Sequence, residues 1–298
     1  MTIQEILSEG KRLLGAPCPG AVIDTPALDA ALLLAETLHL SREELLVRGN
    51  EIAAEPERQK YNSLLERRRS GECIAYILGR REFRGIEFTV NPGVLVPRPD
   101  TETLVEAALE YIDLWQGERS DTSARGAAQG GLSLLDLCTG SGAVAISIKN
   151  ERPHIRVTAS DVSPETLQTA TLNAARLLEG RQNAVQFIQS DLFNNIPEKF
   201  DIIVSNPPYI PTGEIDTLSP EVRREPRLAL DGGRDGLDLI RKIVSQAPEH
   251  LSPGGILLLE ASPEQMPAIK TLLEKEHFNK IKIHKDLAGK DRVISAHL

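Results

Sequence analysis

The tetrapeptide Asn206-Pro207-Pro208-Tyr209 holds the residue types in this chain that are best suited to chemistry. It follows the apolar run 200–205, which predicts a buried strand. Two consecutive prolines exclude both helix and further strand pairing, so the chain must leave the strand in a rigid, extended turn. That turn presents a carboxamide, a backbone carbonyl and an aromatic ring at a strand's carboxyl end, where open α/β sheets bind ligands.

Two of these groups are hydrogen-bond acceptors held close together. The side-chain oxygen of Asn206 and the carbonyl of Pro207 can each accept one N–H of a planar NH2 group, as found on a carboxamide or an exocyclic base amine. We therefore predict Asn206, Pro207 and Tyr209 as catalytic residues, with Pro208 completing the substrate site. Taken alone, the tetrapeptide also fits a simple turn that ends a strand.

A second candidate site is a glycine turn between a predicted strand, Leu134–Cys138, and a predicted helix. Gly140 and Gly142 permit a tight turn and let a ligand press against the backbone. The helix that follows offers free N–H groups and a partial positive charge. The predicted cofactor-binding residues of this turn are Asp136, Cys138, Thr139, Gly140, Ser141 and Gly142.

Acidic residues follow the next two predicted strands. Asp161 lies where a carboxylate typically accepts hydrogen bonds from ribose hydroxyls. Asp191 could accept from an adenine amino group, with Leu192 packing against the ring. Each aspartate alone could simply cap the next helix. Their recurrence at consecutive strand ends favours a nucleoside site, which Asn206 would also border.

Two cofactors fit these residues. The spacing Gly140-x-Gly142-x-x-Ala145 satisfies the dinucleotide fingerprint, so the glycines alone do not separate NAD from S-adenosylmethionine. Three features favour S-adenosylmethionine: the turn follows an additional domain, the last two predicted strands are antiparallel, and hydride transfer has no need of the Asn206–Tyr209 turn.

The elements that must position these residues fall into two patterns. Residues 1–78 predict a helical bundle, with helices starting at Thr25-Pro26 and Ser41 and a third at Glu55–Arg69. Residues 79–96 predict a β-hairpin linker. A helix from Asp100 to about Leu114 then opens the third segment, 97–298, and the polar stretch 116–131 predicts a flexible loop.

From residue 132 onward, strands and helices alternate, which predicts an α/β fold with a mainly parallel, Rossmann-like sheet. The connection 285–291 is too short for a helical crossover, so the final strand pair should be antiparallel. The predicted strands are Leu134–Cys138, Val157–Ser160, Val185–Ile188, Ile202–Ser205, Ile256–Glu260, Lys280–His284 and Arg292–His297. The predicted helices are 143–150, 164–178, 236–250 and 264–275.

Composition narrows the function classes. At 298 residues and a formal net charge of −9, the molecule is not an electrostatic nucleic-acid binder. Three cysteines fit a reducing cytosol, and the polar, acidic first residues exclude a signal peptide, so we expect a cytoplasmic protein without membrane contact. The scattered histidines indicate no metal site. Arg80, Arg81 and Arg84 could contact a partner, although a solvated surface is the commoner explanation of such a run.

Several motifs together resemble one known family. They include Tyr76-Ile77-Leu78-Gly79, Pro97-Arg98-Pro99-Asp100-Thr101-Glu102, the glycine turn, Asn206-Pro207-Pro208-Tyr209-Ile210, Glu225-Pro226-x-x-Ala229-Leu230 and Asp286-Leu287-Ala288-Gly289-x-Asp291-Arg292. On these motifs the chain resembles the release factor glutamine methyltransferases, the HemK/PrmC family, over nearly its whole length.

The resemblance implies a seven-strand S-adenosylmethionine-dependent methyltransferase domain behind a helical domain that recognises the substrate. It also implies methylation of the side-chain nitrogen, N5, of the glutamine in the Gly-Gly-Gln motif of peptide chain release factors, by an enzyme taken by default as a monomer. The chain departs from the family pattern at Cys138, where glycine is usual, and at Asp100, Leu192 and Ala261. The alternatives are a DNA adenine-N6 methyltransferase, disfavoured by the acidic charge, and a nucleoside-binding module without catalysis.

Overall fold

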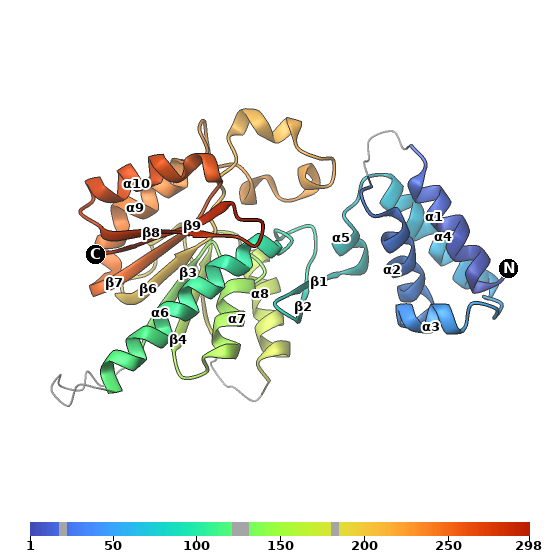
Figure 1. Ribbon diagram of the computed structural model, residues 1–298, viewed down its shortest axis with the longest axis horizontal. Helices are drawn as coiled ribbons and strands as arrows, with labels where there is room; N and C mark the ends of the chain where they lie inside the picture. The colour runs from blue at the N-terminus through green and yellow to red at the C-terminus, as the bar shows by residue number, and fades with distance from the viewer. Residues whose placement is uncertain (18–22, 121–130, 180–184) are drawn as a thin grey trace. The chain divides into compact units, whose positions relative to one another are not determined.

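The computed structural model describes residues 1–17, 23–120, 131–179 and 185–298. The chain divides into two compact units. The first comprises Met1–Arg80 together with Asp216–Glu225, and the second comprises Arg81–Ile215 and Pro226–Leu298. Figure 1 shows the helices of the first unit in blue and the sheet of the second in green to red.

The first unit is a bundle of short helices around an apolar core that includes Leu33, Leu34 and Tyr61. The predicted capping box is confirmed: Ser41 Oγ accepts from the Glu44 N–H at 3.1 Å, and the Ser41 N–H donates to the Glu44 carboxylate at 2.7 Å. The helices of this unit are α1 (Ile3–Gly15), α2 (Pro26–Leu38), α3 (Arg42–Val47), α4 (Glu55–Arg69) and α5 (Ile74–Leu78).

A buried ion-pair cluster ties three parts of the first unit together. Arg68 of α4 bonds Asp29 of α2 at 2.6 Å, and both side chains are almost fully buried. The same guanidinium reaches Glu221, in the returning segment, also at 2.6 Å. That segment contains the end of the 3-10 helix η2 (Thr212–Thr217) and all of η3 (Val222–Arg224). No pattern in the sequence predicts that this segment packs with the N-terminal helices.

The predicted hairpin is present as β1 (Arg80–Phe83) and β2 (Ile86–Thr89). Arg84 and Gly85 between them both have positive φ, 51° and 71°, as the tight turn favoured in β-hairpins requires. Phe83 and Phe88 contact edge to face, with ring centroids 6.1 Å apart. Both rings belong to the core of the second unit.

The second unit is built on a seven-stranded sheet with the order β5-β4-β3-β6-β7-β9-β8. The first five strands in this order are parallel, and β9 pairs antiparallel with both β7 and β8, which confirms the predicted topology. The order reverses at β3, and the crevice at such a switch point is where these sheets bind ligands. The strands are β3 (Ser133–Leu137), β4 (Arg156–Asp161), β5 (Gln186–Gln189), β6 (Phe200–Ser205), β7 (Leu251–Glu260), β8 (Asn279–Lys285) and β9 (Asp291–His297).

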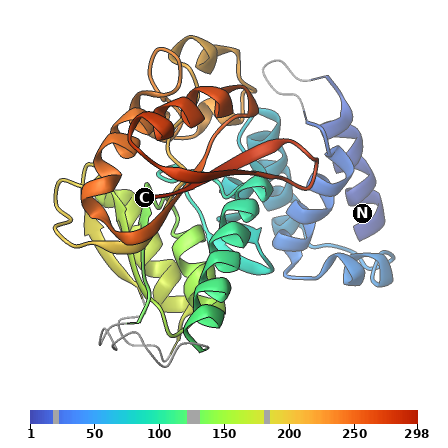
Figure 2. The ribbon, with the colours of Figure 1, turned by 60° about the vertical axis from the view of Figure 1, so that its left-hand side comes forward.

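Helices cover both faces of this sheet, as Figures 1 and 2 show. Within β3, Leu134 packs into the core cluster of α6 (Glu102–Ser120), α7 (Ala143–Glu151) and the hairpin. Leu135 instead packs into the cluster of α9 (Asp238–His250) and α10 (Met266–Lys275). Burial on both faces explains why these strands are continuous apolar runs. The remaining elements are η1 (Pro99–Thr101), α8 (Pro164–Leu177), η4 (Arg227–Ala229) and η5 (Pro263–Gln265).

Two predicted boundaries are wrong. Helix α6 does not end near Leu114 but continues to Ser120, because polar residues without proline do not stop a helix. The rest of the expected loop, 121–130, lies outside the described residues. Strand β7 begins at Leu251 rather than Ile256, because Leu251 pairs with Phe200 ahead of an irregular stretch in the ladder. In the described ranges, no helix has the length and apolar character that crossing a membrane requires.

Candidate active site

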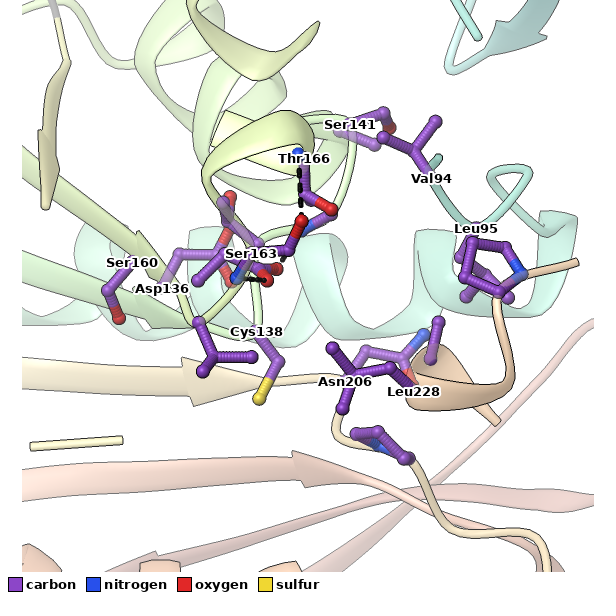
Figure 3. A pocket seen from close by; sticks show the side chains of 18 of the residues that line it. Val94, Leu95, Asp136, Cys138, Ser141, Ser160, Ser163, Thr166, Asn206 and Leu228 are labelled. Carbon is purple, nitrogen blue, oxygen red and sulfur yellow. Dashed lines mark hydrogen bonds between the residues drawn. The ribbon is translucent and has the colours of Figure 1, made fainter. Parts of the chain in front are cut away.

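A cleft lies where β3, β4, β5 and β6 end, with about 1070 Å³ of space that includes some open solvent. The residues that follow these four strands therefore line the same cleft, as the alternation of strands and helices predicted. Figure 3 shows the lining side chains, among them Asp136, Cys138, Ser163 and Asn206. The predicted residues that line the cleft are Asp136, Cys138, Thr139, Gly140, Ser141, Asp161, Asp191, Leu192, Asn206 and Pro208.

Asp136 fixes the glycine turn through two hydrogen bonds. Its Oδ2 accepts from the Thr139 hydroxyl at 2.7 Å and from the Ala145 N–H at 3.2 Å. The second bond satisfies a donor in the first turn of α7, as a capping carboxylate does. Burial raises the pKa of Asp136 to about 7, against the lowering effect of those two hydrogen bonds.

Gly140 and Gly142 serve the turn in different ways. Gly140 has φ +57°, and a side chain there would extend into open space. Because Gly140 lines the cleft, that open space is room for a ligand against the backbone. Gly142 has φ +83°, and a Cβ there would lie 2.7 Å from Ile146 Cδ1. It is the N-cap residue of α7 and is not among the residues lining the cleft.

Asp161 combines a local and a ligand-facing role. Its Oδ2 accepts from the Gly140 N–H at 3.1 Å, and its Oδ1 accepts from the Ser163 N–H at 3.1 Å. The carboxylate therefore fixes the glycine turn while it lines the cleft. Burial raises its pKa, partly offset by these backbone bonds. Both interpretations of this aspartate, turn support and ligand acceptor, are compatible with its position.

Two lining residues have an uncommon backbone conformation. Cys138 has φ 59° and Leu192 has φ 49°, the left-handed region that glycine adopts most easily. The first value explains why glycine suits the position of Cys138. Leu192 is buried and Asp191 beside it is exposed, so this pair offers the cleft an apolar surface and a carboxylate. Burial raises the pKa of the Cys138 thiol, which keeps it protonated and unreactive.

Asn206 has a defined amide orientation. Its Nδ2 donates to Thr101 Oγ1 at 3.1 Å, which leaves Oδ1 as the acceptor of the carboxamide. Thr101 lies in η1 and also lines the cleft. It belongs to the 97–102 motif quoted above, but nothing in the sequence assigned it a partner.

Pro207 and Tyr209 are not among the residues that line the cleft. The Tyr209 hydroxyl donates to Glu260 Oε1 at 3.4 Å, and its carbonyl accepts from Gln265 Nε2 at 2.8 Å. Burial raises the Tyr209 pKa, so the phenol stays a neutral donor. Glu260, the final residue of β7, is buried at 1% exposure. No role was predicted for Glu260, because a glutamate at the end of a strand has no distinguishing motif.

Other lining residues also escaped residue-level prediction. Val94, Leu95, Pro97 and Arg98 approach from the segment before η1, and Leu228 approaches from η4. Pro97, Arg98 and Leu228 lie within motifs that carried the family resemblance, so a motif without an assigned role was the available signal for them, whereas Val94 and Leu95 lie outside those motifs. Within the described residues, no cluster of three or more His, Cys, Asp or Glu side chains could hold a metal ion.

Comparison with known proteins now identifies the family. Residues 5–79 match the model of the PrmC N-terminal domain, and residues 127–219 match the methyltransferase small domain. A release factor glutamine methyltransferase of Neisseria gonorrhoeae is 43% identical over 90% of this chain and 92% of its own length. One from Moorella thermoacetica is 37% identical over 100% and 99%. The chain belongs to the release factor glutamine methyltransferase family.

Solved structures with low sequence identity share the fold. A methyltransferase from Pyrococcus furiosus, 20% identical, covers 79% of this chain and 98% of its own length with a TM-score of 0.50. The catalytic domain of hMettl16, 10% identical, covers 82% of this chain and 81% of its own length with a TM-score of 0.54.

Membership in the family makes the chain an S-adenosylmethionine-dependent methyltransferase. The residues present fit that cofactor. Gly140 leaves open space against the backbone, Asp161 supplies a partly buried carboxylate, and Leu192 adds an apolar surface to the same cleft.

Proposed function

We propose that this enzyme methylates the side-chain nitrogen, N5, of the glutamine in the Gly-Gly-Gln motif of a peptide chain release factor. The observation that carries the proposal is the Asn206 carboxamide in the cleft, with Nδ2 committed to Thr101 and Oδ1 left as an acceptor. A glutamine amide is a planar NH2 group of the kind that such an acceptor suits. The name of the family, release factor glutamine methyltransferase, supports the same substrate.

The proposed cofactor contacts follow the lining of the cleft. Asp161 would accept from the ribose hydroxyls and Asp191 from the adenine amino group, while Leu192 packs against the ring and residues 138–141 pass close to the donor. S-adenosylmethionine supplies an electrophilic methyl group on a sulfonium sulfur. The chain's task is then alignment, because an amide nitrogen is a weak nucleophile with a delocalised lone pair.

Asn206 Oδ1 and the Pro207 carbonyl would each accept one N–H of the substrate amide. These bonds hold the nitrogen toward the methyl group and stabilise the positive charge that develops on it, so they strengthen in the transition state. The nitrogen gains one bond to carbon, and the sulfur keeps the electron pair of the bond that breaks. The nitrogen's surplus proton then leaves to water. The packing of Tyr209 beside the substrate stays a prediction.

The N-terminal helices are proposed to recognise the release factor. Their match to the PrmC N-terminal domain supports a role particular to this family. The arginine cluster offers little support for that role. Arg80 pairs with Glu36 at 2.7 Å, and Arg84 pairs with Glu151 at 2.9 Å and Glu106 at 3.4 Å.

The deciding experiment transfers a labelled methyl group and varies both enzyme and acceptor. Asn206→Ala should lower kcat by about 10²- to 10³-fold, the usual cost of removing one group that stabilises transition-state charge. Its Kd for S-adenosylmethionine, measured by calorimetry, should stay close to that of the unchanged enzyme.

The acceptors are a release factor, the same factor with Gln→Ala in Gly-Gly-Gln, and duplex DNA. Label on the unchanged factor alone is the expected result. Label on DNA would establish the adenine methyltransferase instead, and cofactor binding without any transfer would establish a binding module. Normal turnover by Asn206→Ala would refute the assigned role of the carboxamide.

A further inference from the structure

A buried glutamate, Glu260, accepts a hydrogen bond from Tyr209 of the Asn206–Tyr209 turn. Strands β6 and β7 are parallel neighbours, with Ser205 opposite Leu259. Asn206 and Glu260 therefore follow equivalent positions of adjacent strands. Glu260 is only 1% exposed, although it carries an ionisable group at a strand end.

Thr101 connects this glutamate to the carboxamide. The Thr101 hydroxyl accepts from Asn206 Nδ2 at 3.1 Å and is also hydrogen-bonded to the Glu260 carboxylate. A hydroxyl has one hydrogen, so when its oxygen accepts from Asn206 that hydrogen is free to donate to Glu260. In its ionised form Glu260 only accepts, which then gives the chain of bonds one direction: Asn206 to Thr101 to Glu260.

The direction matters because a carboxamide has two chemically opposite ends of nearly equal size. If the Thr101 hydroxyl donated to Asn206 instead, the amide would turn and present Nδ2 where the acceptor Oδ1 now lies. An NH2 group facing a substrate NH2 group cannot hydrogen-bond to it. The carboxylate at Glu260 thus decides which end of Asn206 faces away from Thr101.

The surroundings of Glu260 indicate that its burial is costly. Its Oε2 is buried without a hydrogen-bond partner among the described residues, and Oε1 receives the Tyr209 hydroxyl at 3.4 Å. Desolvation raises the pKa of Glu260 to about 7, although the positive charge of Arg292 lowers it. That arginine is itself shared with Asp100 at 2.9 Å and Asp286 at 3.2 Å. A buried, incompletely satisfied carboxylate beside an active cleft is typical of a functional group.

We propose that Glu260 is a positioning residue, which acts through Thr101 to hold the Asn206 carboxamide with Oδ1 toward the substrate amide. The inference rests on the function proposed above, because it assigns a support to the acceptor which that function requires. Glu260 touches neither substrate nor cofactor in this role.

The test uses the full-length enzyme with a release factor as methyl acceptor. Glu260→Gln and Thr101→Val should each lower kcat on the order of 100-fold, the cost of misplacing a reacting group by about 1 Å. The Kd for S-adenosylmethionine and the KM for release factor should change by less than about threefold, since the misaligned amide affects the transition state more than binding. Thr101→Ser keeps the hydroxyl and should retain most of the activity.

A double variant distinguishes action through Thr101 from a separate effect. Glu260→Gln combined with Thr101→Val should be no slower than Thr101→Val alone, because both changes break one chain of bonds. Ser147→Ala is the matched control. Its Oγ is the other buried unpaired side-chain atom in the described structure and lies in α7, so turnover should be unchanged.

Unchanged kcat in Glu260→Gln, alongside a large loss in Asn206→Ala, would overturn the positioning role and leave the proposed function intact. Multiplying losses in the double variant would also overturn it. Unchanged turnover in Asn206→Ala would refute the proposed function itself, so the two failures are distinguishable.

Discussion

At the scale of single residues, the cleft is shaped by backbone conformations as much as by side chains. Cys138 and Leu192 keep positive φ without being glycine, and both line the cleft. Such conformations cost about 1–2 kcal/mol each and persist where the surrounding structure fixes them. The turn between β3 and α7 uses its two glycines for different purposes: Gly142 avoids a steric clash, and Gly140 leaves room for a ligand.

Because the two glycines have different roles, substituting each by alanine should affect stability and cofactor affinity in opposite orders. Gly142→Ala places a methyl group 2.7 Å from Ile146 Cδ1 and 3.3 Å from Ala170 Cβ, so unfolding free energy should fall by about 2–3 kcal/mol. Gly140→Ala meets no atom within 4 Å, so it should cost only about 1 kcal/mol of stability.

Cofactor affinity should be affected more by Gly140→Ala than by Gly142→Ala. The methyl group in Gly140→Ala enters the cleft and should weaken S-adenosylmethionine binding about tenfold or more, by roughly 1.4 kcal/mol. Urea unfolding and calorimetric titration of both variants supply the two measurements. A Gly140→Ala variant with unchanged affinity would show that the cofactor does not approach this part of the turn.

At the scale of elements, the sequence predicted the order of strands and helices because each signal is local. Apolar runs mark buried strands, and glycine or proline marks where they end. The carboxyl-end location of Asp136, Asp161 and Asn206 follows from that alternation alone. The Thr101–Glu260 link could not be predicted, since Thr101 in η1 and Glu260 at the end of β7 are far apart in the sequence and carry no shared pattern. Arg68 was likewise one arginine among several on an apparently solvated helix.

The buried Arg68 cluster predicts a large effect from an arginine that looks ordinary in sequence. Arg68→Ala leaves Asp29 buried at 3% side-chain exposure without its charged partner, so stability should fall by about 3–5 kcal/mol. Arg58→Ala, on the same helix, removes an exposed pair with Glu55 and should cost about 0.5 kcal/mol or less. Thermal unfolding followed by circular dichroism compares them. Equal losses would mean that the cluster does not stabilise the helical unit.

At the scale of the whole molecule, carboxyl groups affect stability in two opposite directions. Burial raises the pKa of Asp136 and Glu260 to about 7, so folding makes these two groups easier to protonate. Asp113 and Asp286 have lowered pKa values through hydrogen bonds, chiefly from Arg152 and from the Lys290 backbone respectively, and they favour the folded state when ionised. The pH dependence of stability is the balance of both groups.

Glu260→Gln removes one of the carboxyl groups whose pKa is raised by burial. A carboxyl with a raised folded-state pKa contributes stability that is complete below its unfolded pKa of 4.5 and is lost as pH rises through about 7. The unchanged protein should therefore lose stability relative to the variant, by about 2 kcal/mol, between about pH 5.5 and about pH 8. Urea unfolding at both pH values measures the difference, and the other carboxyl groups cancel. Parallel pH curves for the two proteins would contradict the raised pKa.

The return of Asp216–Glu225 to the N-terminal helices has a consequence for dissecting the protein. The two units are interleaved along the chain, so no single cut separates them into whole pieces. A fragment ending at Arg80 would keep Arg68 and Asp29 but lose Glu221, and a fragment beginning at Arg81 would carry ten residues whose packing partners had been removed. To separate substrate recognition from methyl transfer, Asp216–Glu225 should therefore be removed from the Arg81–Leu298 fragment and joined to the Met1–Arg80 fragment. Truncation at one position is not enough.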